Sequence, residues 1–560
     1  MERLVLDNNW KIIINDKENI KGDHALYSNI LACLSVGETM KSLLGPKSRD
    51  KLIINQYGEI IITNDGITVL KSMNLIHPVS RMMVELSKSM DDQNGDGTTS
   101  VVVLCSLLLK KSLSLLKGDS LSNFNISRGI HPIRIMRGFI KASKISIDTI
   151  KKISKRFDIN SDQGKEILLQ VSTTTLNSKL VSHIYPNLPK LAVDSILLAY
   201  KFSKSNLTTQ SVNIVGVSSG SMEDSKILPY FLLPHSLITP FYPKQSNSKE
   251  FNIVLLDLLF LNNNNNNSKD ITESFQNNEI IIKNDKDIES LIQEQESKVK
   301  SLVITLKKFG ISIVGVGGND GTLAPLVRSY FNKAKISVFK PFDRDEFTNL
   351  SDRLGISILS DISNLSLNTT SSFIGKFKNI KQEIIQSREL YHFEPLDTIS
   401  TPPTIILYGS TDIELQETKR ALHDSLCVLR NLIRDPVVVP GGGACEIQCC
   451  NVILSTIANE NIDGLEMIVL TAFTEALEEI AQILYQNSGI ENHLELILKL
   501  KDYHRVNESN ASFGIDLRTE TMGDMYDLGV LETCSNKLSQ ISMVTEIVSS
   551  ILKIDEIINH

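Results

Sequence analysis

A glycine turn directly before the longest apolar run constrains the fold of this chain most strongly. Residues 94–100 read Asn-Gly-Asp-Gly-Thr-Thr-Ser, and residues 101–109 are mostly aliphatic. An apolar run of this length predicts a buried helix, and the glycines predict a tight backbone turn before it. The unpaired amides of the first helical turn point outward, and the helix dipole favours negative charge there. The sequence therefore predicts an anion-binding helix start near Thr98.

The polar residues of this turn fit a nucleoside triphosphate bound in a non-Walker manner. Asp96 supplies a hard oxygen ligand suited to Mg²⁺, while Thr98 and Thr99 can cap the helix or donate hydroxyl hydrogen bonds to phosphate. No Gly-Lys-Ser/Thr follows the turn. A Gly-Asp-Gly turn by itself is more often a plain loop and cap, so other segments have to decide between the two interpretations.

Three further segments supply turns of the same character. Residues 44–51 begin Leu-Gly-Pro-Lys and end an amphipathic helix pattern. Residues 52–54 and 60–63 are β-branched runs around a turn at residues 56–58, which predicts a hairpin. Residues 437–444 read as a strand that leads into a triple-glycine turn and another helix.

The order of these segments closely resembles the group II chaperonins, the family of the eukaryotic cytosolic chaperonin and the archaeal thermosome. The resemblance covers nearly the whole chain. Its motifs are Leu44-Gly45-Pro46-Lys47, Thr63-Asn64-Asp65-Gly66, Gly95-Asp96-Gly97-Thr98-Thr99-Ser100, Leu422-His423-Asp424-Ser425-Leu426, Val439-Pro440-Gly441-Gly442-Gly443 and Gly514-Ile515-Asp516. Residues 551–558 also look like that family's final strand.

Composition agrees with this resemblance. The chain has 560 residues, of which 41% are hydrophobic and 22% charged, so it can form two or three domains with substantial cores. A net charge of -7, without a lysine-arginine stripe, argues against nucleic acid as the main partner. Seven cysteines without a secretion signal favour a reducing compartment. Lys110 and Lys111 interrupt the apolar run well short of the roughly 20 residues that span a membrane. We therefore expect a cytoplasmic protein with no membrane partner.

The resemblance implies a mainly α fold with an α/β apical domain, in a three-domain chaperonin architecture. Residues 1–141 and 435–560 would form the equatorial domain, and residues 142–212 and 404–434 the intermediate domain. Residues 213–403 would form the apical, substrate-binding domain, with a helix beginning at Asp287.

The resemblance also assigns a site for ATP and Mg²⁺. The aspartate of the Leu-His-Asp motif would orient the attacking water, which makes Asp424 the catalytic candidate, while Asp96 would hold the metal. The nucleotide-binding candidates are Gly45, Pro46, Gly95, Asp96, Gly97, Thr98, Thr99, Ser100, Gly442 and Gly443, with Asp516 and Glu532 near the base. Without the resemblance, Asp424 reads as part of a solvated helix face and Asp516 as a turn residue. His423 reads as a structural or surface residue rather than a base.

Three other features of the sequence do not indicate a further site. Residues 312–321 mimic a dinucleotide fingerprint, but Asp320 occupies the third glycine position. Cys445 and Cys449 share a helical face without a second ligand pair at zinc spacing, which favours buried helix cysteines. The asparagine run at residues 262–267 reads as a disordered surface insertion.

Departures from the family pattern leave two classes of function open. Ser48 and Arg49 replace the usual Gly-Met, and Asn55 stands where the family has an aspartate, so a charged partner for Mg²⁺ or water is lost there. The segment at residues 227–235 also differs, so substrate choice does not transfer. The first class is an ATP-hydrolysing chaperone subunit that binds unfolded or partly folded polypeptides and assembles with other chaperonin subunits into a double ring. The second is a diverged protein similar to the McKusick-Kaufman and Bardet-Biedl chaperonin-like proteins, acting as a scaffold at the centrosome or ciliary base with weak or no ATPase. The retained loop at residues 95–100 and Asp424 favour the first class.

Overall fold

A computed structural model describes most of the chain. The described residues are 20–54, 58, 60–118, 129–179, 181, 184–202, 207, 211–242, 251–257, 285–317, 325–360, 370–385, 388–395, 402–460 and 462–557. They form two compact units. The two-segment unit combines residues 1–194 with 412–560, and the central unit comprises residues 195–411. Helix α8 (Leu188–Phe202) continues from the first unit into the second.

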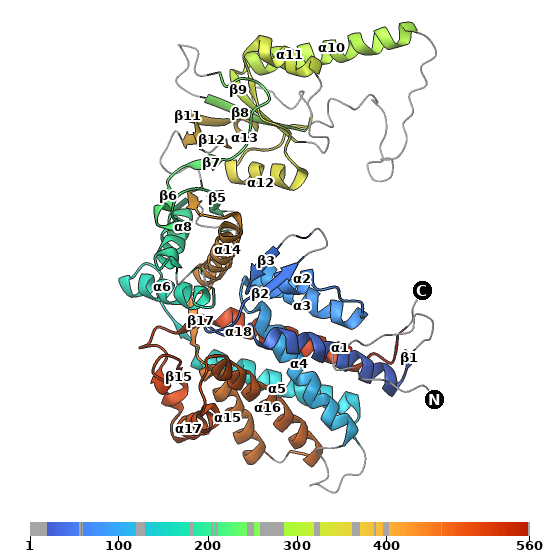
Figure 1. The fold of residues 1–560 in the computed structure, drawn as a ribbon, viewed down its shortest axis with the longest axis vertical. Helices are drawn as coiled ribbons and strands as arrows, with labels where there is room; N and C mark the ends of the chain where they lie inside the picture. The colour runs from blue at the N-terminus through green and yellow to red at the C-terminus, as the bar shows by residue number, and fades with distance from the viewer. Residues whose placement is uncertain are drawn as a thin grey trace. The chain divides into compact units, whose positions relative to one another are not determined.

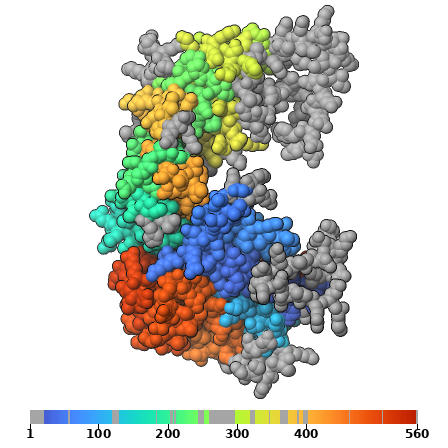
Figure 2. Space-filling view, in the orientation of Figure 1, coloured from blue at the N-terminus to red at the C-terminus, as the bar shows by residue number. Residues whose placement is uncertain are grey.

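The two-segment unit is a helical assembly in which the two ends of the chain pack together. Its N-terminal helices, blue to cyan in Figures 1 and 2, lie beside the orange and red C-terminal helices. The helices are α1 (Asp23–Lys41), α2 (Gly66–Ser72), α3 (Pro78–Asn94), α4 (Thr98–Lys117), α5 (Pro132–Ile153), α6 (Asp162–Leu176), α14 (Asp412–Arg434), α15 (Ala444–Asn459), α16 (Gly464–Asn487), α17 (His493–Val506) and α18 (Cys534–Leu552). A short 3-10 helix covers Glu508–Ser512.

Helix α4 is the centre of this unit's core. It packs against α1, α3, α16 and α18, and most of its apolar side chains are completely buried. By length and composition alone this helix could cross a membrane, but a buried core helix passes the same test. The helix continues through Lys110 and Lys111, because their ammonium groups pair with Glu479 and Glu475 of α16 at 2.8 Å each. The two lysines thus interrupt the apolar run, as the sequence indicates, but they do not end the helix.

Short strands connect these helices. They are β1 (Ile20–Lys21), β2 (Lys51–Ile54), β3 (Ile60–Thr63), β4 (Lys155–Arg156), β14 (Val437–Pro440), β15 (Phe513–Asp516), β16 (Thr521–Asp524), β17 (Leu531–Thr533) and β18 (Glu556–Ile557). Strands β2 and β3 form the predicted antiparallel hairpin, and β14 lies between β17 and β4. The predicted final strand at residues 551–558 is wrong in extent, because α18 continues to Leu552 and only Glu556–Ile557 pair with β1.

The central unit is built on a mixed sheet covered by helices. Its strands are β5 (Asn213–Val217), β6 (Lys226–Leu228), β7 (Phe231–Leu233), β8 (Phe251–Asp257), β9 (Ile311–Gly317), β10 (Ser337–Val338), β11 (Gly375–Ile385), β12 (Arg388–Pro395) and β13 (Thr404–Tyr408). Six of them pair in the order β10-β9-β8-β11-β12-β7, and β5-β13-β6 form a separate sheet. The helices are α10 (Asp285–Lys308), α11 (Pro325–Ala334), α12 (Arg344–Leu354) and α13 (Thr370–Phe373), with a 3-10 turn at Met222–Asp224.

The two faces of strand β8 explain the layers of this unit. Val254 and Leu256 pack with side chains of α10 and α11, whereas Ile253 and Leu255 pack with α12 and the aromatic residues of β11 and β12. Successive side chains of a strand point to opposite faces, so a continuous apolar run predicts a strand covered on both sides. Figure 1 shows α10 and α11 on one side of the sheet and α12 on the other.

The dinucleotide-like glycines have a packing role in the described part of this unit. A Cβ added at Gly315 would lie 2.7 Å from Leu255, and one at Gly317 would lie 2.3 Å from Phe347. These glycines allow close contact within the core. Residues 318–321 of the fingerprint and the asparagine run lie outside the described residues.

The mainly α fold with an α/β portion is confirmed. The residue bounds of the five segments that make up the three domains stay predictions.

Candidate functional site

A cavity of about 590 Å³ lies in the two-segment unit, between elements from both ends of the chain. Its volume falls within the usual range of about 300–1,000 Å³ for small-molecule sites. All the residues singled out in the sequence line it, namely Gly45, Pro46, Gly95, Asp96, Gly97, Thr98, Thr99, Ser100, Asp424, Gly442, Gly443, Asp516 and Glu532. Folding thus brings together residues that are up to 487 positions apart (532 minus 45).

The loop between α3 and α4 requires its two glycines. Gly95 and Gly97 have φ angles of 70° and 78°, in the left-handed region. A Cβ at Gly95 would lie 2.2 Å from the Cβ of Cys427, and one at Gly97 would lie 2.4 Å from Nε2 of Gln540. Helix α4 begins at Thr98 with no side-chain cap on its first amides. The predicted glycine turn and helix start are therefore present, with close neighbours on both glycines, and anion binding at this helix start stays a prediction.

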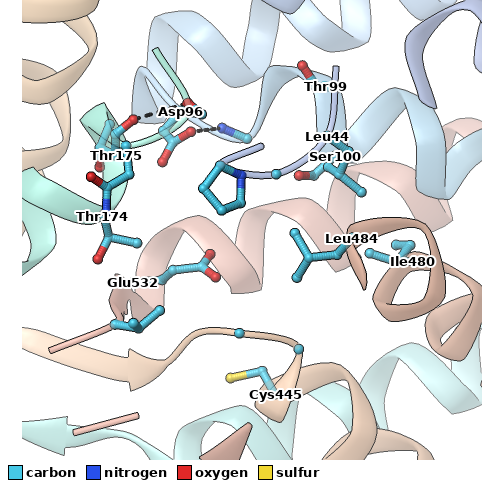
Figure 3. Close-up of a pocket in the computed structure, with 18 of the residues that line it drawn as sticks. Leu44, Asp96, Thr99, Ser100, Thr174, Thr175, Cys445, Ile480, Leu484 and Glu532 are labelled. Carbon is cyan, nitrogen blue, oxygen red and sulfur yellow. Dashed lines mark hydrogen bonds between the residues drawn. The ribbon is translucent and has the colours of Figure 1, made fainter. Parts of the chain in front are cut away.

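Asp96 lies within this loop and its side chain projects into the pocket (Figure 3). Its Oδ1 accepts a hydrogen bond of 2.6 Å from the Gly97 amide, and the Thr175 hydroxyl donates to the same carboxylate. Burial raises the pKa of Asp96, although these hydrogen bonds and the charges of Lys179 and Lys537 oppose the rise. A buried carboxylate of this kind gains from a nearby cation.

The donor set around Asp96 fits Mg²⁺ in the presence of a phosphate ligand. Among the described residues, no cluster of three or more His, Cys, Asp or Glu side chains could hold a metal alone. Mg²⁺ is commonly held by one or two carboxylates together with substrate phosphates and water. Asp96 at an anion-binding helix start meets that requirement with a single protein ligand.

Asp424 forms a buried ion pair at the edge of the same cavity. It lies on α14, and its Oδ2 is 3.1 Å from Nζ of Lys179, which follows α6; their side chains are 15% and 9% exposed. Burial raises the pKa of Asp424 well above its ordinary value, with the Lys179 charge opposing. Burial alone would lower the pKa of Lys179, but Asp424, Asp65 and Glu417 outweigh it and raise it. The solvated-face interpretation of Asp424 is therefore wrong.

A second acid lies close to Asp424. Burial raises the pKa of Asp91, on α3, to about 6, and the charges of Asp65 and Asp92 add to the effect. The charge of Asp91 adds to the effect of burial on Asp424 and raises its pKa further, because like charges in one region disfavour the charged form. This part of the site is therefore rich in acids and depends on Lys179 for compensation.

His423 is exposed on α14 and has one side-chain contact on the same helix. Its Nε2 lies 3.5 Å from the Sγ of Cys427, and burial lowers its pKa. It does not line the cavity. This geometry is consistent with the structural or surface residue expected from the sequence.

The triple-glycine turn forms another wall. Gly442 and Gly443 have φ angles of 59° and 79°, and the Tyr485 hydroxyl donates a 2.8 Å hydrogen bond to the Gly442 carbonyl. Asp516 accepts hydrogen bonds from the Arg518 amide and the Thr519 hydroxyl, at 2.9 Å each. Burial opposes these bonds, yet they lower the pKa of Asp516. Asp516 is thus a turn residue that also lines the cavity.

Apolar side chains complete the pocket. Leu44, Ile480 and Leu484 lie together on one side in Figure 3, and a Cβ at Gly45 would lie 2.6 Å from Leu484. The Asn487 amide at the end of α16 donates to the carbonyls of Lys41 and Leu44, at 2.8 Å each. These contacts fix the Gly-Pro turn and leave an apolar surface suited to a flat ring.

Sequence reasoning missed several polar residues of the pocket wall. Lys179, Thr175, Glu446, Lys537 and Gln540 all line the cavity. Lys179 lies within residues 142–212, which the resemblance assigned to the intermediate domain and not to the nucleotide site. Glu446, Lys537 and Gln540 carry no local signal, since their partners come from other segments. Asn55 lies outside the described residues.

The cysteines are structural in the described part of the chain. All seven are free and buried, and burial raises the pKa of Cys33, Cys427 and Cys449 to about 12. Cys445 and Cys449 line the cavity but donate to the carbonyls of Pro440 and Ser146. The prediction of buried helix cysteines is confirmed.

Comparison with known proteins defines the class. The model of the TCP-1/cpn60 chaperonin family matches residues 36–560, so the chain belongs to this family, and it is a group II chaperonin. T-complex protein 1 subunit delta of Debaryomyces hansenii is 30% identical over 547 residues, covering 97% of this chain and 96% of that protein. The subunits named delta from Eremothecium gossypii and Homo sapiens are 29% and 28% identical, over 97% and 95% of this chain and 97% and 93% of those proteins. The family assignment supports a molecular chaperone with the three-domain chaperonin architecture.

Proposed function

We propose that this chain is an ATP-hydrolysing chaperonin subunit whose nucleotide occupies the cavity of the two-segment unit. One observation carries the proposal: a single cavity is lined by the helix start at Thr98, the carboxylate of Asp96 and the buried pair of Asp424 and Lys179. Amides at a helix start bind phosphate, and a cation and a carboxylate on the same wall supply the charges that phosphoryl transfer uses.

The protein groups have separate tasks in this proposal. The amides after Gly97 bind the phosphates, and Asp96 would hold Mg²⁺, which supplies charge neutralisation when bound. Asp424 orients the attacking water and accepts its proton, because its raised pKa places it nearer the range of a general base. Lys179 compensates the negative charge that Asp424 and the phosphates bring together.

Assembly is supported by an exposed apolar hairpin and by the names of the relatives. Leu52, Ile54 and Ile60 of β2 and β3 are 62%, 65% and 50% exposed. An exposed apolar group of this kind fits burial against another subunit. The relatives are named as subunits, and we propose that this chain likewise joins other chaperonin subunits in a cytoplasmic double ring that binds unfolded or partly folded polypeptides.

ATP turnover by the full-length chain tests the proposal. Asp424→Asn should reduce turnover by about 100-fold or more, because the base is lost while the side chain keeps its shape. ATP affinity should change only a few-fold, since Asp424 does not bind the phosphates. Turnover is measured by phosphate release, and affinity by calorimetry.

Asp435→Ala is the matched control. Asp435 directly follows α14, and its ion pair with Arg156 at 2.6 Å is exposed and outside the cavity. Exposed pairs contribute about 0–1 kcal/mol, so turnover should remain within about twofold. Equal, near-zero turnover in the wild type and Asp424→Asn would instead favour the scaffold function, as would native sedimentation as a small complex in cell extract.

A further inference from the structure

Helix α5 concentrates positive charge on its exposed side. It contains six lysines and arginines and one aspartate, a formal charge of +5, whereas the whole chain carries -7. Its other side is buried against α15, α16 and α18 (Figure 1). None of the six cations lines the cavity described above. The charge of this helix therefore has no part in the proposed hydrolysis.

Isoleucines and cations alternate along the exposed side of α5 and form what we call the mixed stripe. Its six members, spaced alternately four and three residues apart, are Ile133, Arg137, Ile140, Lys144, Ile147 and Lys151. Ile133 and Ile140 are 48% and 40% exposed, Ile147 is half-buried and the three cations are exposed. Residues three and four apart lie on one side of an α-helix. The mixed stripe is thus a continuous line on the surface.

The three cations of the mixed stripe are uncompensated within the part of the chain that the structure describes. The neighbouring cations Arg134 and Lys141 pair with acids at the start of α16, at 4.0 and 3.1 Å. No described carboxylate forms an ion pair with the cations of the stripe, and Asp148, the one acid of α5, forms no ion pair there. These three charges are therefore available to acids of a partner.

The composition of the mixed stripe argues against three kinds of partner. Sites for single-stranded nucleic acid stack bases on aromatic rings, but isoleucines separate these cations. A basic amphipathic helix binds a membrane through its apolar face, which in α5 is buried in the core. A second copy of this chain paired symmetrically through the same stripe would bring like charges together.

The spacing of the stripe indicates the shape of the partner. Its cations recur every seven residues, which is about 10.5 Å along a helix. Side chains on one face of an extended strand recur about every 6.8 Å, so a strand cannot meet all three cations. A second helix with a seven-residue repeat has the same spacing, and its apolar side chains can pack on the intervening isoleucines.

We propose that the mixed stripe docks an acidic amphipathic helix of another protein, lying lengthwise on α5. Carboxylates repeated every seven residues pair with Arg137, Lys144 and Lys151, and apolar side chains between them cover Ile133 and Ile140. Isolated exposed isoleucines are ordinary on a protein surface, but a regular row between unpaired cations is suited to this partner. The surface is independent of the proposed function, because no member of the stripe lines the cavity.

Binding of a labelled synthetic helix to the full-length chain tests the proposal. The probe is a peptide of about 28 residues in which isoleucine and glutamate alternate at the spacing of the stripe, with alanine and glutamine elsewhere. The comparison peptide has the same composition in an order without the seven-residue repeat. Fluorescence anisotropy should show at least about tenfold tighter binding of the repeat peptide, because only this peptide meets all three cations at once.

Variants of the stripe should weaken binding of the repeat peptide. The triple variant Arg137→Glu, Lys144→Glu, Lys151→Glu should bind it at least about tenfold more weakly, because three attractions become repulsions. The double variant Ile133→Ser, Ile140→Ser should bind it several-fold more weakly, because apolar contact is lost. If the triple variant does not fold, as judged by thermal unfolding, the same three positions changed to glutamine decide.

Three exposed lysines on other helices provide the matched control. Lys88 lies on α3, and Lys190 and Lys201 lie on α8. Changing all three to glutamate alters the net charge of the chain as much as the triple variant of the stripe does. Binding of the repeat peptide should stay within about twofold of wild type, because these positions lie outside the stripe.

Several results would overturn the docking role. A wild type that binds the two peptides equally, or binds neither, would show that the stripe does not recognise a helix. An equal loss in the lysine control would assign binding to net charge. Displacement of the peptide by polyuridylate as readily as by unlabelled peptide would indicate a general polyanion surface. Self-association of the wild type that the triple variant abolishes, measured by sedimentation, would make the stripe a contact between copies of this chain.

Discussion

The cavity of the two-segment unit and the sheet of the central unit are held together by different interactions. The cavity wall contains buried charges in compensated groups, such as Asp424 with Lys179 and Lys537 with two glutamates. The central unit instead packs aromatic rings against one another, with Phe393 lying 5.2 Å from Phe377 and 5.8 Å from Phe231 between ring centroids. Apolar packing tolerates exchange of side chains that conserve volume, whereas a buried charge requires its partner.

This difference explains why the cavity could be recognised from the sequence and the central unit could not. Groups that must meet the same small ligand are restricted in type and position, and several of them lie in short contiguous motifs. The central unit requires only that the volumes of its core side chains and the alternation of residues along its strands are kept. Many different sequences meet this requirement. The segment at residues 227–235 illustrates this, since it departs from the family pattern but still supplies β6 and the buried strand β7.

The largest expected effect comes from the aromatic core of the central unit. Phe393→Ala should reduce the free energy of unfolding of that unit by about 3–5 kcal/mol, because a completely buried ring is replaced by a cavity. ATP affinity should stay within about twofold of wild type. Calorimetric unfolding with and without ATP measures both quantities.

Phe473→Ala is the corresponding variant in the two-segment unit. Phe473 is equally buried in the two-segment unit, with its ring 5.7 Å from that of Phe139. Phe473→Ala should lower the stability of the unfolding transition that ATP stabilises, which belongs to the two-segment unit. Phe393→Ala should lower the stability of the other transition, which belongs to the central unit. A single transition that moves equally in both variants would show that the two units do not unfold separately, and the comparison would fail.

A smaller effect is expected from two glycines with similar backbone angles. Gly97 (φ 78°) is crowded by Gln540, whereas Gly355 (φ 63°), after α12, has nothing within 4 Å of an added Cβ. Both alanine variants should lose about 1–2 kcal/mol of stability from left-handed strain. Only Gly97→Ala should also weaken ATP binding, by about tenfold or more, because the loop must shift. Equal ATP affinities in the two variants would contradict a ligand-specific role for this loop.

The smallest expected effect concerns the acids near Asp424. The pKa of Asp91 is about 6 in the folded chain, against about 3.9 in an unfolded one. The stability that this group contributes below pH 3.9 is therefore lost as the pH rises through 6. Asp91→Asn should stabilise the two-segment unit at pH 7.5 by about 1–2 kcal/mol, after discounting for partial exposure, and should have little effect near pH 4.

Urea unfolding between pH 4 and 7.5 measures this change. Asp92→Asn, at the exposed neighbouring position, should keep most of the pH dependence, because burial raises the pKa of Asp91 more than the Asp92 charge does. A stabilisation of Asp91→Asn that is the same at both ends of the range would rule out titration as its cause. The expected result would support the contrast between the two regions. It would show that the cavity region keeps a charged group although that group lowers its stability.

Much of the fold and most of the pocket could be predicted from contiguous signals. The glycine turn and the apolar run located the start of α4 at Thr98, and the β-branched runs located the β2–β3 hairpin. The strand β14 and the following glycine turn were predicted for the same reason. The roles assigned to the pocket residues stay predictions until nucleotide binding is measured.

The features that the sequence did not predict depend on contacts between residues that are far apart in the chain. Lys537 pairs with Glu446, 91 positions away, and neither residue has a local pattern that marks it. The pairs of Lys110 and Lys111 with Glu479 and Glu475 of α16 are likewise not visible in the local sequence. The resemblance placed a final strand over residues 551–558, but α18 continues to Leu552, because a short apolar run fits a helix or a strand equally well.

The burial of every cysteine has a practical consequence for studying this chain. A thiolate that forms only at high pH, inside a packed helix, reacts with an alkylating dye only after the surrounding structure opens. The rate of dye uptake would therefore report local opening without any engineered label. Because none of the seven lies in the central unit, the reporter reads the two-segment unit alone.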